Sequence, residues 1–138
     1  ETGLTGEIPR RTEFETPEMA FRTSSGEVDP LRDDQALVVR TEEGLVVLLG
    51  CGHSGAINTV RYARELSGES KVLALVGGMH LQGASEDRVR RTAEGLSDLG
   101  VERVIAAHCT GWRAACRLAD VLGERFYYAA VGTEWTFP

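Results

Sequence analysis

Residues 45–55 of the chain read LVVLLGCGHSG, an apolar run that ends in a glycine-rich loop carrying His53. A short run of valine and leucine, apolar on both faces, is typical of a strand that is covered on both sides of a sheet. The residues that follow, 56–66, repeat their apolar side chains at helical spacing. The stretch therefore predicts a strand–loop–helix unit with a histidine in its loop.

The same unit recurs twice further along the chain. Residues 71–76 predict a second buried strand, His80 lies in the loop after it, and a helix follows. Residues 101–107 predict a third strand, which leads directly into His108 and a helix over 112–122. The carboxyl ends of strands in α/β sheets form the edge where ligands collect. We therefore expect an α/β fold in which the three imidazoles meet within a few ångströms of one point.

The chain divides at residue 36. Residues 1–35 hold three of the four prolines and show little periodicity, which predicts a loop-rich lead-in segment. Residues 36–138 form the predicted α/β domain, in which residues 36–41 pair with the apolar run quoted above as a β-hairpin. Towards the carboxyl end, residues 126–131 and 133–137 predict two further strands. The chain starts without Met, so we expect a processed chain or a piece of a longer protein.

Composition excludes several classes of protein. The 138 residues carry a net charge of −6 and no dense basic cluster, so we expect no nucleic-acid partner. No apolar run approaches the roughly 20 residues of a membrane span, and no signal peptide is recognisable, so we expect no membrane partner. The three cysteines are unevenly spaced, which is unlike a disulfide framework. These features favour a cytoplasmic globular protein.

The loop histidines point to metal chemistry. Neutral imidazole is a favoured ligand of zinc and related ions, and rigid strand ends fix its geometry. A single loop histidine is more often a hydrogen-bonded structural or surface residue, but three in equivalent loops favour a site. The glycines around them either allow close backbone approach or mark the ends of helices and strands.

Other polar residues of these loops leave alternatives open. Cys51 and Cys109 lie within two residues of a histidine, so a thiol nucleophile is one hypothesis and small packing residues the other. Cys116, inside a predicted helix, is expected to pack. Thr110 and Ser54 stand at helix starts, where they either donate hydrogen bonds to an anion or cap the helix.

Four segments together resemble the metallo-β-lactamase superfamily, in its branch of dihydropterin-ribofuranosylaminobenzene-phosphate synthase-like proteins. Members of that branch carry the patterns TGxIPR, GCxHxG, GGxHLxGA and HCTG. The matching segments in this chain are TGEIPR (5–10), GCGHSG (50–55), GGMHLQGA (77–84) and HCTG (108–111). They occur in order and cover nearly the whole chain.

The resemblance implies the C-terminal half of an αββα sandwich with a metal site at the sheet edge. His53 and His108 would be metal ligands. His80 lies near the place where relatives have a bridging Asp, so it would bind metal or act catalytically on the substrate. From the residues themselves we expect Arg10 to meet an anionic group of the substrate, with a surface role as the alternative, and Thr110 to contact the substrate at its helix start. The expected cofactor is zinc, as two ions in the complete domain, with Mn or Fe as alternatives.

One departure from the family pattern is large. The ligand motif H-x-H-x-D-H, which belongs to the N-terminal half of the superfamily fold, is absent from this chain. We therefore expect an N-terminal half, from the same precursor or a separate chain, as a partner. A half alone would expose an apolar sheet face, so a homo-oligomer is a further expectation.

The loop histidines and the family resemblance together predict part of a metal-dependent hydrolase, incomplete without its other half. Its metal-bound hydroxide would attack an ester-like or phosphate-bearing small molecule. The alternative is a non-catalytic binding or assembly module of the same fold. A third hypothesis is a thiol-dependent hydrolase that uses Cys51 or Cys109.

Overall fold

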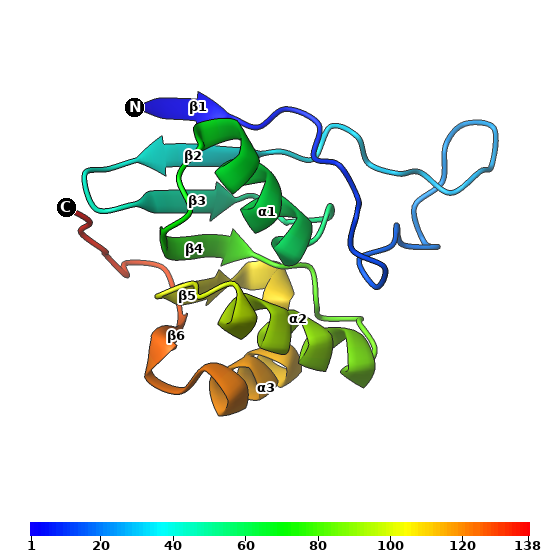
Figure 1. The fold of residues 1–138 in the computed structure, drawn as a ribbon. Coiled ribbons are helices and arrows are strands. Elements are labelled where there is room, and N and C mark those ends of the chain that lie inside the picture. The colour runs from blue at the N-terminus through cyan, green and yellow to red at the C-terminus, as the bar shows by residue number, and fades with distance from the viewer.

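The computed structural model describes residues 1–138 as one mixed sheet with three helices (Figure 1). The strands lie in the sheet in the order of the sequence. The strands are β1 (Thr2–Leu4), β2 (Ala36–Arg40), β3 (Leu45–Leu49), β4 (Val72–Gly78), β5 (Val104–Ala107) and β6 (Phe126–Tyr128). The helices are α1 (Ala56–Ser67), α2 (Glu86–Asp98) and α3 (Trp112–Leu122), with short 3-10 turns at His108–Thr110 and Gly123–Arg125.

The pairing of neighbouring strands changes once along the sheet, from antiparallel to parallel. β1, β2 and β3 are antiparallel neighbours, whereas β3 to β6 run parallel to one another. Each of α1, α2 and α3 connects two of these parallel strands. The carboxyl ends of β3, β4 and β5 therefore meet at one edge. The predicted α/β class with three strand–loop–helix units is confirmed.

The three helices pack on one face of the sheet and enclose the main core. Alternate residues of β3, Leu45 and Val47 among them, point to this face and are fully buried. The helices contribute their apolar stripes to the same core: Ile57, Val60, Ala63, Val89, Ala93, Leu96, Ala114, Leu118 and Leu122. Ser85 caps α2 by accepting a hydrogen bond from the backbone N–H of Arg88.

The opposite face of the sheet carries a smaller apolar cluster. Its centre is Val46, Leu73, Ala74 and Ile105, each at most 4% exposed. Phe137, from the last residues of the chain, packs against this cluster. The face is thus covered in part by the chain's own carboxyl-terminal segment.

The prediction of a strand over 133–137 is wrong, and the strand predicted over 126–131 ends at Tyr128. The chain turns at Gly132, where the backbone N–H of Thr133 donates to Ala130 O at 3.0 Å. No strand follows this turn. The segment after it packs through side chains, with the Trp135 ring edge-on to Tyr127 at 4.5 Å, instead of through a ladder of backbone hydrogen bonds.

The lead-in segment, residues 1–35, contains β1 and an isolated bridge between Arg22 and Val28. The rest of it passes beyond the carboxyl ends of the central strands (Figure 1). None of the three helices is long and apolar enough to cross a membrane.

Candidate metal centre

Two of the three loop histidines lie against each other at the carboxyl edge of the sheet. The ring centroids of His53 and His80 are 4.0 Å apart. Glu18, from the lead-in segment, joins them through a 2.9 Å contact between its Oε1 atom and Nε2 of His80. Potential ligand atoms of these three residues lie within 4.8 Å of one another. We call Glu18, His53 and His80 the histidine-pair group.

The third histidine belongs to a separate group. His108 Nε2 lies 3.3 Å from Cys51 Sγ, and Cys109 completes a set whose potential ligand atoms again fall within 4.8 Å. We call Cys51, His108 and Cys109 the cysteine group. The three imidazoles thus fall into two groups of candidate ligands, with His53 and His80 in contact and His108 beside the thiols, and the meeting of all three at one point stays a prediction.

The loops that carry the two groups pack backbone to backbone. The N–H of Gly78 donates to Gly50 O at 3.1 Å, and a Cβ atom at Gly52 would lie 2.7 Å from Gly78 O. A Cβ atom at Gly78 would lie 2.5 Å from Cys109 Sγ and 2.6 Å from His108 Nε2. Glycine at these positions thus lets the cysteine group sit directly on the loop that leads to the histidine pair.

His80 itself has a strained backbone, with φ at 45°. This left-handed conformation is costly for a residue with a side chain and is concentrated at functional sites. A contact with a neighbouring loop keeps the backbone in this conformation. Met79, the residue before it, donates its backbone N–H to Thr110 Oγ1 at 3.2 Å.

The lead-in segment supplies two side chains that the sequence analysis missed. Besides Glu18, Phe21 stands edge-on to His53, with centroids 5.2 Å apart, and lies 6.0 Å from the His80 ring. Phe21 is half-buried and shields one side of the pair. The histidine-pair group is therefore assembled from residues far apart in the sequence.

Contacts with α1 hold the lead-in segment in this place. Asn58, 2% exposed, accepts hydrogen bonds from the backbone N–H groups of Arg11 and Thr12 at 2.9 and 2.8 Å. Glu15, 1% exposed, accepts from the N–H groups of Ile57 and Asn58 at 2.9 and 2.8 Å. Gly55 has no side chain to cap α1, so the Glu15 carboxylate satisfies the helix amides from outside.

Burial is the main influence on the pKa of Glu15. Desolvation raises the pKa of its carboxyl above the ordinary value, while the two backbone hydrogen bonds act in the opposite direction. The geometry leaves room for nothing larger than glycine beside it, since a Cβ atom at Gly55 would lie inside the Glu15 carboxylate. Gly55 and Glu15 therefore form one interlocked feature.

Arg10 and Thr110, the predicted substrate contacts, both brace the loops. The Arg10 guanidinium donates to the backbone oxygens of His53 at 2.8 Å, Pro30 at 3.0 Å and Glu15 at 3.2 Å. Thr110 is fully buried and its hydroxyl accepts the N–H of Met79, while its contact with a substrate stays a prediction. In this structure the hydrogen bonds of Arg10 and Thr110 hold the histidine loops in position.

The donor set fits a divalent ion. Nδ1 of His53 and Nδ1 of His80 are both buried and have no hydrogen-bond partner. Burial lowers the pKa of His53, and the neighbouring His80 adds to this effect. A neutral imidazole with a free nitrogen is the form that binds metal. Carboxylate, imidazole and thiolate are all common zinc ligands.

Cys109 is poorly suited to be a nucleophile. Burial raises the pKa of the Cys109 thiol to about 11, so the thiol stays protonated at neutral pH. A catalytic cysteine requires the opposite shift. Cys116 lies on the exposed side of α3, contrary to its predicted packing role.

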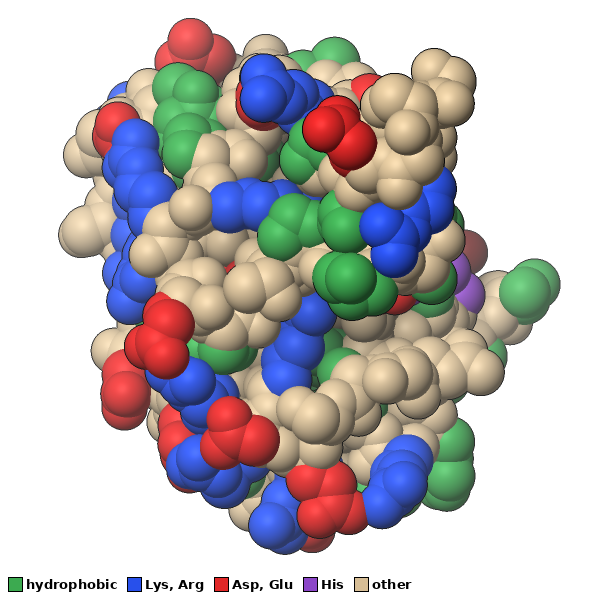
Figure 2. Space-filling model, turned by 90° about the vertical axis from the view of Figure 1, so that its right-hand side faces the viewer, with side chains coloured by type: hydrophobic (Ala, Val, Ile, Leu, Met, Phe, Trp, Pro, Cys, Tyr) green, Lys and Arg blue, Asp and Glu red, His purple; other side chains and the backbone are tan.

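Figure 2 faces the edge where the carboxyl ends of the strands lie. Basic and acidic side chains are interspersed over it, and a small part of the histidine surface shows at one side, beside apolar atoms.

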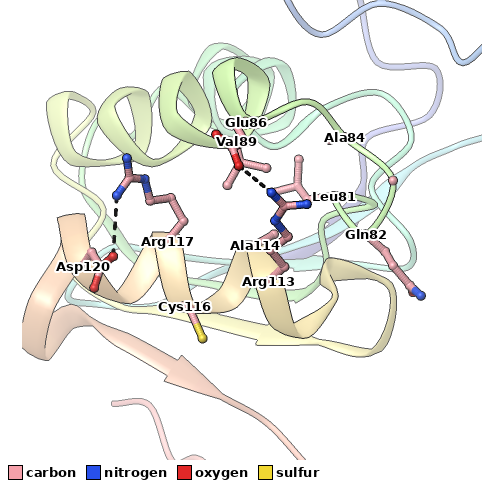
Figure 3. A pocket seen from close by; sticks show the side chains of 11 residues that line it. Leu81, Gln82, Ala84, Glu86, Val89, Arg113, Ala114, Cys116, Arg117 and Asp120 are labelled. Atoms are coloured by element: carbon pink, nitrogen blue, oxygen red, sulfur yellow. Dashed lines mark hydrogen bonds and ion pairs between the residues drawn. The ribbon is translucent and has the colours of Figure 1, made fainter.

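Two cavities flank the loop after His80. One, about 450 Å³ in volume, is lined by His80 and Glu18 together with residues of the lead-in segment and the start of α2. The other, about 460 Å³, lies between α2 and α3 on the far side of residues 81–84. In Figure 3 the two arginines of this second cavity, Arg113 and Arg117, reach Glu86 and Asp120. Only the first cavity adjoins the candidate metal ligands.

Comparisons with known proteins identify relatives of the chain. No protein-family model matches it. It is 34% identical over 108 residues to 7,8-dihydropterin-6-methyl-4-(beta-D-ribofuranosyl)-aminobenzene-5'-phosphate synthase of Methanocaldococcus jannaschii, a match that covers 77% of this chain and 37% of the relative. It is 30% identical over 130 residues to uncharacterized protein MJ0448 of the same organism, covering 94% of this chain and 47% of that protein.

A solved structure shows the same fold. The crystal structure of Tm1679, a metal-dependent hydrolase of the β-lactamase superfamily, matches with a TM-score of 0.87 and 32% sequence identity. The match covers 99% of this chain and 53% of that one. The chain thus spans about half, or less, of the length of the proteins it matches.

Proposed function

Because this chain belongs to the metallo-β-lactamase superfamily, we propose that it forms part of a metal-dependent hydrolase whose centre lies at the carboxyl edge of β3, β4 and β5. The observation that carries the proposal is the histidine-pair group. Two imidazoles in contact, each with a buried, unpartnered nitrogen, and a carboxylate against one of them form a ligand set. We propose His53 and His80, with Glu18, as ligands of one ion.

The cysteine group is the proposed place of a second ion. His108 and the two thiols offer three donor atoms beside the same loops. Bound metal would act as a Lewis acid that activates a water and polarises an ester-like group. Zinc suits the mixed nitrogen, oxygen and sulfur donors, with Mn or Fe as alternatives at the histidine-pair group.

The residues around the ligands prepare them for this task. The lowered pKa of His53 keeps its ring neutral, and Arg10 fixes the backbone of His53 through a 2.8 Å hydrogen bond. The 2.9 Å contact between Glu18 Oε1 and His80 Nε2 holds these two proposed ligands together. Phe21 covers the pair and limits access of water.

We propose that the remaining ligands come from an N-terminal half of the same domain, on the same precursor or on a separate chain. Each group on this chain offers three donors, and the sequence lacks H-x-H-x-D-H. The half-length match to the relatives supports this proposal. The substrate we propose is an ester-like or phosphate-bearing small molecule, in keeping with the phosphate in the name of the related synthase.

Hydrolysis by the full-length protein tests the proposal. After metal loading, p-nitrophenyl acetate, p-nitrophenyl phosphate and bis-p-nitrophenyl phosphate are offered as substrates. We expect hydrolysis of at least one of them, reduced by about 100-fold or more in His80→Ala, since a missing ligand removes the Lewis acid. Glu13→Ala, from the same lead-in segment but exposed, is the control. Equal rates in wild type and His80→Ala would refute the proposed centre.

A non-catalytic assembly module is the second candidate. The observation that favours it is the apolar cluster on the second face of the sheet, which the carboxyl-terminal segment covers in part. Such a module would bind a partner without bound metal. Full-length protein that associates through this face and contains no metal would support it over the hydrolase.

A further inference from the structure

The cavity beside His80 has two kinds of wall. Phe14, Met19 and Ala84 give it an apolar side, and Glu18, His80 and Arg88 give it a polar side. The lining residues come from the lead-in segment, the loop after β4 and the start of α2. A ligand in this space of about 450 Å³ would lie against the candidate metal centre.

The Arg88 side chain, which lines this cavity, has N–H donors without hydrogen-bond partners. Its Nε atom is buried without a partner, and its only side-chain hydrogen bond is a long one, 3.4 Å from a terminal nitrogen to Thr16 O. It forms no ion pair. A guanidinium offers several N–H donors in a planar fork that matches oxyanions, so the partner that would fill it is an anion.

The other arginines of the same helix are paired. Arg90 contacts Asp87 at 2.6 Å and Glu94 at 2.7 Å, and Arg91 contacts Glu13 at 3.4 Å. The arginines of the cavity in Figure 3 also have acidic partners. Arg88 is thus distinguished from its neighbours by the absence of a carboxylate.

The acidic groups near Arg88 are engaged elsewhere. Glu18 contacts His80 and Asp87 contacts Arg90. Glu15 attracts Arg88 from further away, but both of its carboxylate oxygens accept backbone hydrogen bonds from α1. The positive charge of Arg88 is therefore left without a direct counter-ion beside the cavity.

We propose that Arg88 binds an oxyanion group of the substrate, a phosphate or a carboxylate, while the apolar wall contacts the rest of that molecule. The proposal rests on the proposed function, since it places this group next to the candidate metal centre. Arg88 is then a residue that determines substrate specificity. The substrate it selects is an anionic ester with an apolar or aromatic part.

Calorimetric titration of the metal-loaded full-length protein tests this role. The probes are phenyl phosphate, phenylacetate and the neutral phenylacetamide. A charge-assisted pair is worth about 1.5–3 kcal/mol, which corresponds to roughly 10- to 100-fold in affinity. We expect Arg88→Gln to weaken binding of at least one anionic probe by that factor, and the two anions distinguish phosphate from carboxylate recognition. Binding of phenylacetamide should not change.

Matched variants separate this role from folding and from the metal. Arg90→Gln, two residues away and outside the cavity, should bind the anions like wild type. Arg88→Lys should retain part of the affinity and serves if Arg88→Gln does not fold. Metal content is measured on the same samples. Wild-type protein without bound metal would refute the proposed function but would not by itself refute the role of Arg88. Equal anion affinity in wild type, Arg88→Gln and Arg88→Lys would overturn the role of Arg88.

Discussion

Replacing Glu15 by Ala removes the carboxylate that caps α1 from the lead-in segment. The N–H groups of Ile57 and Asn58, which donate to it at 2.9 and 2.8 Å, would be left without partners in a buried place. Hydrogen bonds to a charged acceptor contribute about 1.5–3 kcal/mol each, and loss of a helix cap costs about 0.5–2 kcal/mol. The cost of burying the carboxylate offsets part of this loss.

The expected result is a fall of about 2–4 kcal/mol in the free energy of unfolding. Urea denaturation followed by circular dichroism measures it, with the m-value checked for constancy. Glu13→Ala is the matched control, since Glu13 lies two residues away and its side chain is 86% exposed. If Glu15→Ala and Glu13→Ala unfold at the same urea concentration, the external cap does not stabilise the protein.

The remaining predictions concern pH and the loops of the site. Since the folded-state pKa of Glu15 is raised, folding favours its protonated form, and stability should fall as pH rises from about 4.5 through the raised pKa. Glu15→Gln should lack this slope, and an opposite slope in wild type would show that the α1 hydrogen bonds outweigh burial. Gly78→Ala should lower metal affinity at the cysteine group by at least about 10-fold, because its Cβ would lie 2.5 Å from a cysteine sulfur. Isothermal titration with zinc measures this affinity. The control Gly50→Ala should leave the affinity unchanged, since a Cβ at Gly50 would meet no neighbouring atom. Arg10→Gln should lower the free energy of unfolding by about 2 kcal/mol in urea, since it removes three hydrogen bonds to backbone oxygens; unchanged stability would contradict the bracing role.

The strand–loop–helix units could be predicted from sequence because their signals are local. The apolar run of β3, the helical spacing in α1 and the glycines between them depend only on neighbouring residues. The helix starting after Ser85 was predictable for the same reason. The placement of His53 and His80 at one edge followed from the parallel order of their strands.

The contribution of the lead-in segment could not be predicted in that way. Glu18 and Phe21 lie beside the histidine pair because the lead-in segment is hydrogen-bonded to α1, through Asn58 and through backbone amides of the helix. These contacts join residues that are far apart in the sequence. One signal was present: α1 begins after Gly55, which cannot cap it, so an acceptor from elsewhere was required. The placement of His108 beside the cysteines depends on side-chain packing against Gly78, which periodicity does not encode.

Metal content of the full-length protein tests the central proposal most directly. Elemental analysis is made on wild type, His53→Ala, His108→Ala and the control Glu13→Ala, each after equilibration with zinc and desalting. We expect bound metal in wild type and in the control, and a loss of about one ion per chain in each histidine variant. The same metal content in all four proteins would contradict it.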